Sequence, residues 1–227
     1  MRGEPLAICA LSLSLAMASA AGGADHFPFT EGIIYEYERI PQHFGRFTAT
    51  FSGTVDIEGT TTQVRRFDDG QQQFWSETPE GDKLLHGIAF RDEMPLLFSP
   101  PILWIDEPLH LGKIWEVDSV DSDSLAFHIR YEVTAFGDVT VPAGTFQAFT
   151  IRETVEFPEG GRVDKVRRLA QEIWGSSNTT QQVSERSYAD GIGPILIVFG
   201  SRSDRLLSFR TVAVQASTWS RIRMLYR

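Results

Sequence analysis

The chain has 227 residues, of which 42% are hydrophobic and 22% are charged, and its formal net charge is -9. This is the composition of a globular protein with one domain or two small ones, and it excludes the disordered, collagen-like and multi-span membrane classes. The acidic balance argues against nucleic acid as a partner, because binding to a phosphate backbone depends on clustered Lys and Arg. The single cysteine, Cys9, allows neither a disulfide within the chain nor a multi-cysteine metal site.

The N-terminal segment has the features of an export signal. Leu6–Ala18 is a short apolar run, and Ala18-Ser19-Ala20 offers the small residues that a signal peptidase accepts. The run is too short to cross a hydrocarbon core of about 30 Å as a stable helix. We therefore expect a protein that is exported to the periplasm or secreted, with residues 1–20 as a cleaved signal peptide. The rest divides into a linker (21–31), a folded domain (32–214) and a basic C-terminal tail (215–227).

Apolar and polar side chains alternate through most of the folded domain, which predicts strands. In chain order we expect them at 33–40, 47–58, 61–67, 72–78, 83–90, 114–119, 125–135, 146–157, 195–199 and 206–214. The gaps between successive strands are short and rich in turn-forming residues, which indicates antiparallel hairpins. The predicted fold is mostly β: a single curved antiparallel sheet or a half-open β-barrel.

Two stretches break the alternation. Residues 98–108 contain three prolines, which cannot donate to a β-ladder, so a loop or an edge crossing is expected there. Between Val163 and Trp174 the apolar residues recur every three or four positions and Gly175 follows, which is typical of a helix. Such a helix would pack in or near the mouth of the barrel, although a strand in this region is the open alternative.

Two motifs carry a resemblance to a known family. Residues 139–146 read V-T-V-P-A-G-T-F and residues 188–195 read Y-A-D-G-I-G-P-I. Together they resemble the paired signature of a family of uncharacterised exported bacterial proteins, and the P-L-H-L-G-K-I-W of residues 108–115 is similar to a further element of that family. The resemblance implies a half-open antiparallel barrel like that of the periplasmic lipoprotein carriers, with no established activity. Physically, Pro142, Gly144, Gly191 and Gly193 are typical of turns.

No group of residues in the sequence has the spacing of a catalytic or metal site. The histidines His26, His43, His86, His110 and His128 lie far apart, and neither an H-E-x-x-H pair nor a G-x-S-x-G nucleophile elbow occurs. We therefore expect no metal, no cofactor and no catalytic residue, and an enzyme is the less favoured reading.

Three functions remain open. The favoured one is an exported, non-enzymatic binding or carrier module for an apolar or lipid-like ligand, because sixteen phenylalanines and five tryptophans suit an apolar sheet face. The second is a structural or assembly protein of the cell envelope, which would use a sheet edge or contact an envelope protein or membrane surface through the arginine-rich C-terminus. The third is an exported hydrolase with a dispersed site. The predicted ligand-binding residues are Phe47, Phe51, Val55, Phe127, Ile129 and Tyr131.

Overall fold

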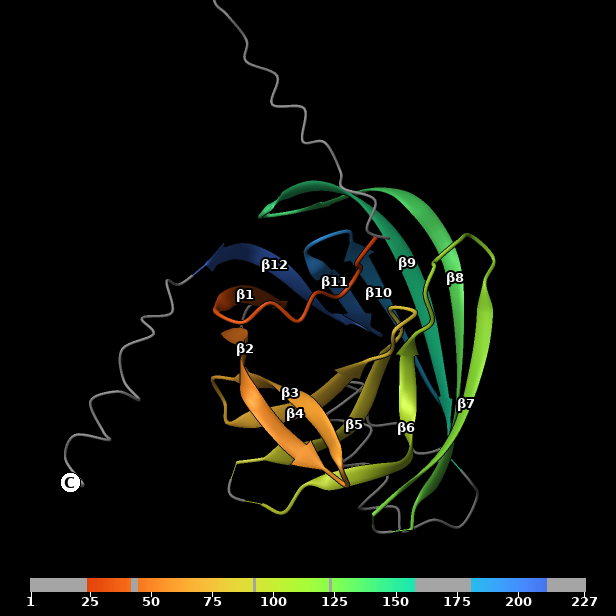
Figure 1. Cartoon of the computed structure of the whole chain (residues 1–227). Coiled ribbons are helices and arrows are strands. Elements are labelled where there is room, and N and C mark those ends of the chain that lie inside the picture. Colours follow the sequence, from red (N-terminus) through yellow and green to blue (C-terminus); the bar gives the residue numbers. More distant parts are fainter. Residues whose placement is uncertain (1–23, 42–44, 92, 123, 158–180, 212–227) are drawn as a thin grey trace, which may run out of the picture.

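The computed structural model describes residues 24–41, 45–91, 93–122, 124–157 and 181–211. They form a closed, wholly antiparallel barrel of twelve strands, each hydrogen-bonded to the strands before and after it in the chain (Figure 1). The strands are β1 (Ile33–Ile40), β2 (Arg46–Ile57), β3 (Thr60–Phe67), β4 (Gln71–Glu77), β5 (Lys83–Phe90), β6 (Leu96–Ile105), β7 (Ile114–Asp121), β8 (Ala126–Val141), β9 (Gly144–Glu156), β10 (Gln181–Ala189), β11 (Gly193–Phe199) and β12 (Arg202–Thr211).

The alternation in the sequence determines which side chains face the interior. In β8, Phe127 and Ile129 are at most 3% exposed, whereas His128 between them is half-buried on the outer surface. Phe51 in β2 is fully buried beside the half-buried Thr50. Within the described residues, which end at 211, the predicted strands are confirmed, and so is the prediction of a mostly β fold.

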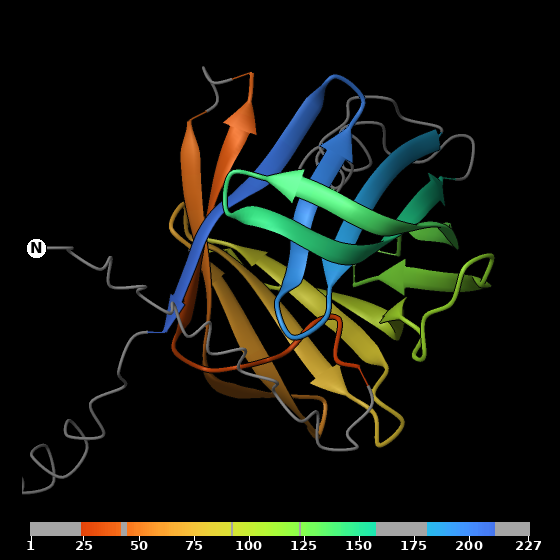
Figure 2. The ribbon, with the colours of Figure 1, turned by 90° about the horizontal axis from the view of Figure 1, so that it is seen from above.

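The barrel closes where β1 pairs with β12 over the whole length of β1, from Ile33 opposite Thr211 to Ile40 opposite Ser203. The prediction of a half-open barrel is therefore wrong (Figure 2). Closure depends on pairing between the first and last strands, and the alternation within either strand carries no information about its distant partner. The described residues contain no helix, and the helix predicted for residues 163–174 lies outside them. The structure thus shows no helix, in its described part, that could span a membrane.

Strand β6 corrects the prediction of a loop in the proline-rich stretch. Its prolines are accommodated because only two residue pairs, Phe98–Asp121 and Ser99–Val120, join β6 to β7. Beyond these two pairs, hydrogen bonds from side chains to backbone carbonyls take the place of the backbone ladder. The Ser119 hydroxyl donates to the Pro100 carbonyl at 2.7 Å, and the Trp115 indole donates to the Leu103 carbonyl at 3.0 Å. We refer to this weakly paired junction as the β6–β7 seam.

Residues 24–31 belong to the folded unit, although a linker is predicted there. Phe27 is 3% exposed, and its ring packs edge-on against Trp75 inside the barrel with 4.9 Å between centroids. The buried Lys83 Nζ lies 3.0 Å from the Asp25 carboxylate, which holds the start of the segment to β5. The segment therefore crosses one end of the barrel (Figure 2), and its phenylalanines pack against aromatic side chains of the interior. The alternation of apolar and polar residues does not reveal such a segment, because its residues form no strand.

Candidate functional site

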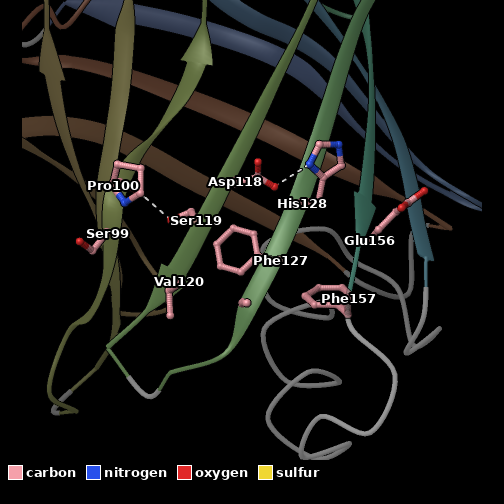
Figure 3. Close-up of a pocket in the computed structure, with 10 residues that line it drawn as sticks. Ser99, Pro100, Asp118, Ser119, Val120, Phe127, His128, Glu156 and Phe157 are labelled. Carbon is pink, nitrogen blue, oxygen red and sulfur yellow. Dashed lines mark hydrogen bonds and ion pairs between the residues drawn. The ribbon is translucent and has the colours of Figure 1, made fainter.

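The candidate site is a cavity of about 520 Å³ that opens at the β6–β7 seam (Figure 3). Four consecutive strands contribute to it, at the end of the barrel where β6 and β8 begin and where β7 and β9 end. Its lining residues are Ser99, Pro100, Asp118, Ser119, Val120, Ala126, Phe127, His128, Glu156 and Phe157. We refer to it as the seam pocket.

The floor of the seam pocket is aromatic. The Phe127 ring points inward, meets Phe98 edge-on at 5.7 Å between centroids, and lies 6.4 Å from the ring of Phe157. Val120 and Ala126 line the outer part and are exposed, with Val120 38% accessible to solvent. Apolar groups thus extend from the surface to the core without a polar layer between them.

A histidine and a carboxylate lie at the rim of the pocket because of the register between β7 and β8. Asp118 is directly opposite His128 in that ladder, and the Asp118 Oδ1 to His128 Nδ1 distance is 2.8 Å. Glu156 is opposite His128 on the other side, in β9. Side chains at the rim can therefore donate hydrogen bonds to the polar end of a ligand or accept hydrogen bonds from it.

Among the described residues of the rim, no serine is aligned with the Asp118–His128 pair. Ser119 is the serine nearest in sequence to Asp118, but it has the opposite parity on β7, faces the interior and donates its hydroxyl to the Pro100 carbonyl. Within the described part of the chain, the hydrogen bonds of His128 include none to a serine. The Asp118–His128 pair is therefore a hydrogen-bonded pair on the outer surface, with no described nucleophile aligned to it.

The predicted ligand-binding residues do not form one site. Phe51, Ile129 and Tyr131 belong to the main core cluster, and Phe47 belongs to a second cluster around β1. Val55 is 38% exposed, since a β-bulge between Phe51 and Thr54 changes the strand's register. Of the six, Phe127 alone lines the seam pocket. The prediction identified inward-facing aromatics, but it could not separate those that fill the core from those that border a cavity.

The residues predicted to form turns lie in a turn or at the first position of a strand. Pro142 stands in the turn that joins β8 to β9, and Gly144 is the first residue of β9, with a φ of 143°. Gly191 lies in the turn before β11 and Gly193 is the first residue of that strand, with φ values of 69° and 104°. A Cβ at Gly193 would lie 3.3 Å from the Phe27 ring, so a glycine there also allows the close approach of the N-terminal segment.

A polar cluster inside the barrel was not predicted from the sequence. The buried Glu153 carboxylate accepts hydrogen bonds from Ser184 Oγ at 2.8 Å and from Arg186 Nε at 3.1 Å. Burial raises the pKa of Tyr131 well above its ordinary value, and the neighbouring negative charge of Glu153 raises it further. The sequence did contain a signal for this cluster: Glu153 and Arg186 are charged residues within the strands β9 and β10, and a charged side chain that turns into a barrel must find a partner there.

Among the described residues, no group of three or more His, Cys, Asp or Glu side chains is placed to hold a metal ion. The basic C-terminal tail, which is a predicted contact with a membrane surface or an envelope protein, lies outside the described residues.

The comparisons with known proteins give no family. No family model matches the chain, and no curated protein is similar to it. Two solved structures align with 83% of this chain and with the whole of their own length. One is a candidate lipoprotein from Parabacteroides distasonis, with 11% identity and a TM-score of 0.39. The other is a candidate exported protein with a YmcC-like fold from Bacteroides fragilis, with 11% identity and a TM-score of 0.42. Similarity this low is not evidence of a shared function.

Proposed function

We propose that this protein is an exported, non-enzymatic binding module that takes an apolar or lipid-like ligand in the seam pocket. The observation that carries the proposal is a cavity of about 520 Å³ that leads from exposed apolar residues to the aromatic core. A volume of this size and an apolar lining with a few polar groups at the rim are typical of small-molecule sites. Export itself is proposed from the sequence of residues 1–20.

The seam offers a physical reason why a ligand would bind there rather than at the centre of the barrel. Phe27, Phe51, Trp75 and Trp104 already occupy the central region, with ring centroids 4.9 to 5.7 Å apart along the contacts that link them. At the seam, by contrast, two residue pairs form the whole β6–β7 ladder. Widening this junction disrupts few backbone hydrogen bonds, so an acyl chain can approach the Phe127 ring from the side.

The test is the binding of a fluorescent fatty-acid analogue to the purified protein and to two matched variants. Val120 and Ile114 are both outward-facing apolar residues of β7, 38% and 50% exposed, but Val120 alone lines the seam pocket. We expect Val120→Asp to weaken probe binding at least tenfold, because it places a carboxylate against the acyl chain, while Ile114→Asp binds as the wild type does. Equal affinities of the two variants, or the absence of saturable binding to the wild type, would refute the proposal.

A hydrolase is the second candidate: the Asp118–His128 pair at the rim favours it, although no described serine hydrogen-bonds to His128. If it were catalytic, ester substrates with an acyl chain would be turned over, and His128→Gln would abolish turnover while it left probe binding intact. The envelope-assembly alternative rested on a bare sheet edge or on the basic C-terminal tail. Among the described residues the closed barrel leaves such an edge only at the seam, and the tail lies outside them.

A further inference from the structure

A second pocket, separate from the seam pocket, lies inside the barrel between the first four and the last three strands. It has a volume of about 60 Å³. A single water needs roughly 10–15 Å³ on this measure, so the pocket has room for one tetrahedral oxyanion. Its lining residues are Tyr37, Arg39, Phe47, Arg65, Phe67, Gln71, Gln73, Arg186, Ile197, Phe199, Arg202 and Asp204. We refer to it as the arginine pocket.

Aromatic rings hold the four guanidinium groups of the arginine pocket in place. Arg39 lies over the Phe47 ring at 4.3 Å, and Arg65 lies over the Phe67 ring at 5.1 Å. Arg186 and Arg202 both lie 5.4 Å from the centroid of one further ring, that of Phe199 in β11. Stacking of this kind fixes the plane of a guanidinium and leaves its N–H groups at the edge free to donate.

The carboxylates in and beside the arginine pocket do not balance its positive charge. Asp204 lies 3.6 Å from Arg39 and 3.0 Å from Arg202, and Glu153 pairs with Arg186. Among the described residues, four guanidinium groups therefore meet two carboxylates, an excess of two positive charges in a chain whose net charge is -9. Asp68 and Asp69 are near enough to influence Arg39, but both are exposed on the turn between β3 and β4.

Arg65 is the member of the cluster that most clearly lacks a partner. It is 6% exposed, and its one hydrogen bond among the described residues is a long one, 3.5 Å from Nη2 to the Tyr37 hydroxyl oxygen. Its Nε is buried without a hydrogen-bond acceptor, and the Nε of Arg39 also lacks a hydrogen bond, although Asp204 Oδ1 lies 3.6 Å from it. A buried charge without a counter-ion destabilises the folded protein, because the desolvation of the charge is not offset by a partner. An anion in the pocket would offset this cost.

We propose that the arginine pocket binds a phosphate group, either as a free ion or as the phosphate monoester of an anionic amphiphile. Two uncompensated positive charges match a dianionic phosphate, and guanidinium edges pair with its oxygens in a bidentate way. The amides of Gln71 and Gln73 supply further donors at the mouth. The proposal is independent of ligand binding in the seam pocket, because the two cavities have no lining residue in common.

The experiment measures the melting temperature and the binding isotherm with two probes, inorganic phosphate and dihexanoyl phosphatidate. Sodium chloride at the same ionic strength is the control for general salt effects. The variants are Arg65→Met and Arg66→Met, which remove neighbouring arginines from opposite faces of β3. Arg66 is exposed and donates to Ser52 Oγ at 2.9 Å, so its loss leaves the arginine pocket unchanged.

We expect at least one probe to bind the wild type and the Arg66→Met variant saturably, and Arg65→Met to bind it at least tenfold more weakly. Binding of inorganic phosphate identifies a free anion as sufficient, whereas binding of the phosphatidate alone identifies a headgroup. Methionine conserves much of the arginine's apolar volume, and Arg202→Met at the more exposed rim provides a second test should Arg65→Met fail to fold. The proposal is overturned if neither probe exceeds the chloride control, or if the Arg65 and Arg66 variants bind equally.

Discussion

Removal of the Phe27 ring tests whether the N-terminal segment is an integral part of the barrel. The ring is 3% exposed and contacts Phe29, Phe51, Trp75 and Tyr188 with centroids 4.9 to 6.2 Å away. A Phe→Ala change at a site buried to this extent costs about 3–5 kcal/mol, since the removed atoms leave a cavity that the barrel wall cannot collapse to fill. At about 2–4 °C per kcal/mol for a domain of this size, the melting temperature should fall by roughly 6–20 °C.

The assay is thermal unfolding followed by circular dichroism and by tryptophan fluorescence, because Trp75 lies against the ring. The control is Phe209→Ala, which removes a ring that is 43% exposed and should change stability by less than about 0.5 kcal/mol. A second variant, Gly193→Ala, should be less costly in the Phe27→Ala background, because the new methyl group then no longer meets the ring. Equal melting temperatures for the two phenylalanine variants would show that the segment is only loosely attached.

Three further predictions concern the barrel wall and its interior. Phe127→Asp should destabilise the fold by roughly 3 kcal/mol or more, because it buries a charge without a partner. His128→Asp on the outer face should cost less than about 1 kcal/mol, even though it faces the like charge of Asp118. Similar urea midpoints for the two variants would contradict the assigned faces. Glu153→Gln should cost about 3–5 kcal/mol because it removes the carboxylate charge that pairs with the Arg186 guanidinium. A second change, Arg186→Met, should recover part of that loss, and no recovery in urea unfolding would argue against the pair. Burial lowers the pKa of His86 below its ordinary 6.5, so the unfolded chain takes up the proton more readily and stability should fall as the pH drops below that value. The His86→Gln variant should therefore show a smaller change of melting temperature between pH 7 and pH 5. An unchanged slope would assign the pH dependence to other groups.

The strands could be predicted from the sequence wherever one face is apolar and the other polar. Strand β10 was missed because its inward face carries Gln182 and Ser184, both 2% exposed, so its buried positions do not look hydrophobic. Strand β6 was missed for a different reason. Its prolines exclude a continuous ladder, and only the structure shows that Ser119 and Trp115 replace the missing hydrogen bonds with side-chain donors.

The candidate sites could not be predicted from the sequence, because each one combines residues from several strands. The seam pocket depends on the register that sets Asp118 opposite His128, and on where the β6–β7 ladder stops. The arginine pocket brings Arg39 and Arg65 together with Arg202, which lies more than 130 positions further along the chain. Nothing in the spacing of these arginines distinguishes them from the exposed Arg66.

By itself the sequence determined the chain's acidic character, the positions of most strands and the inward direction of side chains such as Phe51 and Phe127. These are local properties, since strand periodicity is set by neighbouring residues in the backbone. The tertiary structure alone decided that the sheet closes, that Phe27 fills one end of it, and that Arg65 is buried without a carboxylate. Those features depend on pairing and packing between distant segments, which is long-range information that an alternating pattern does not contain.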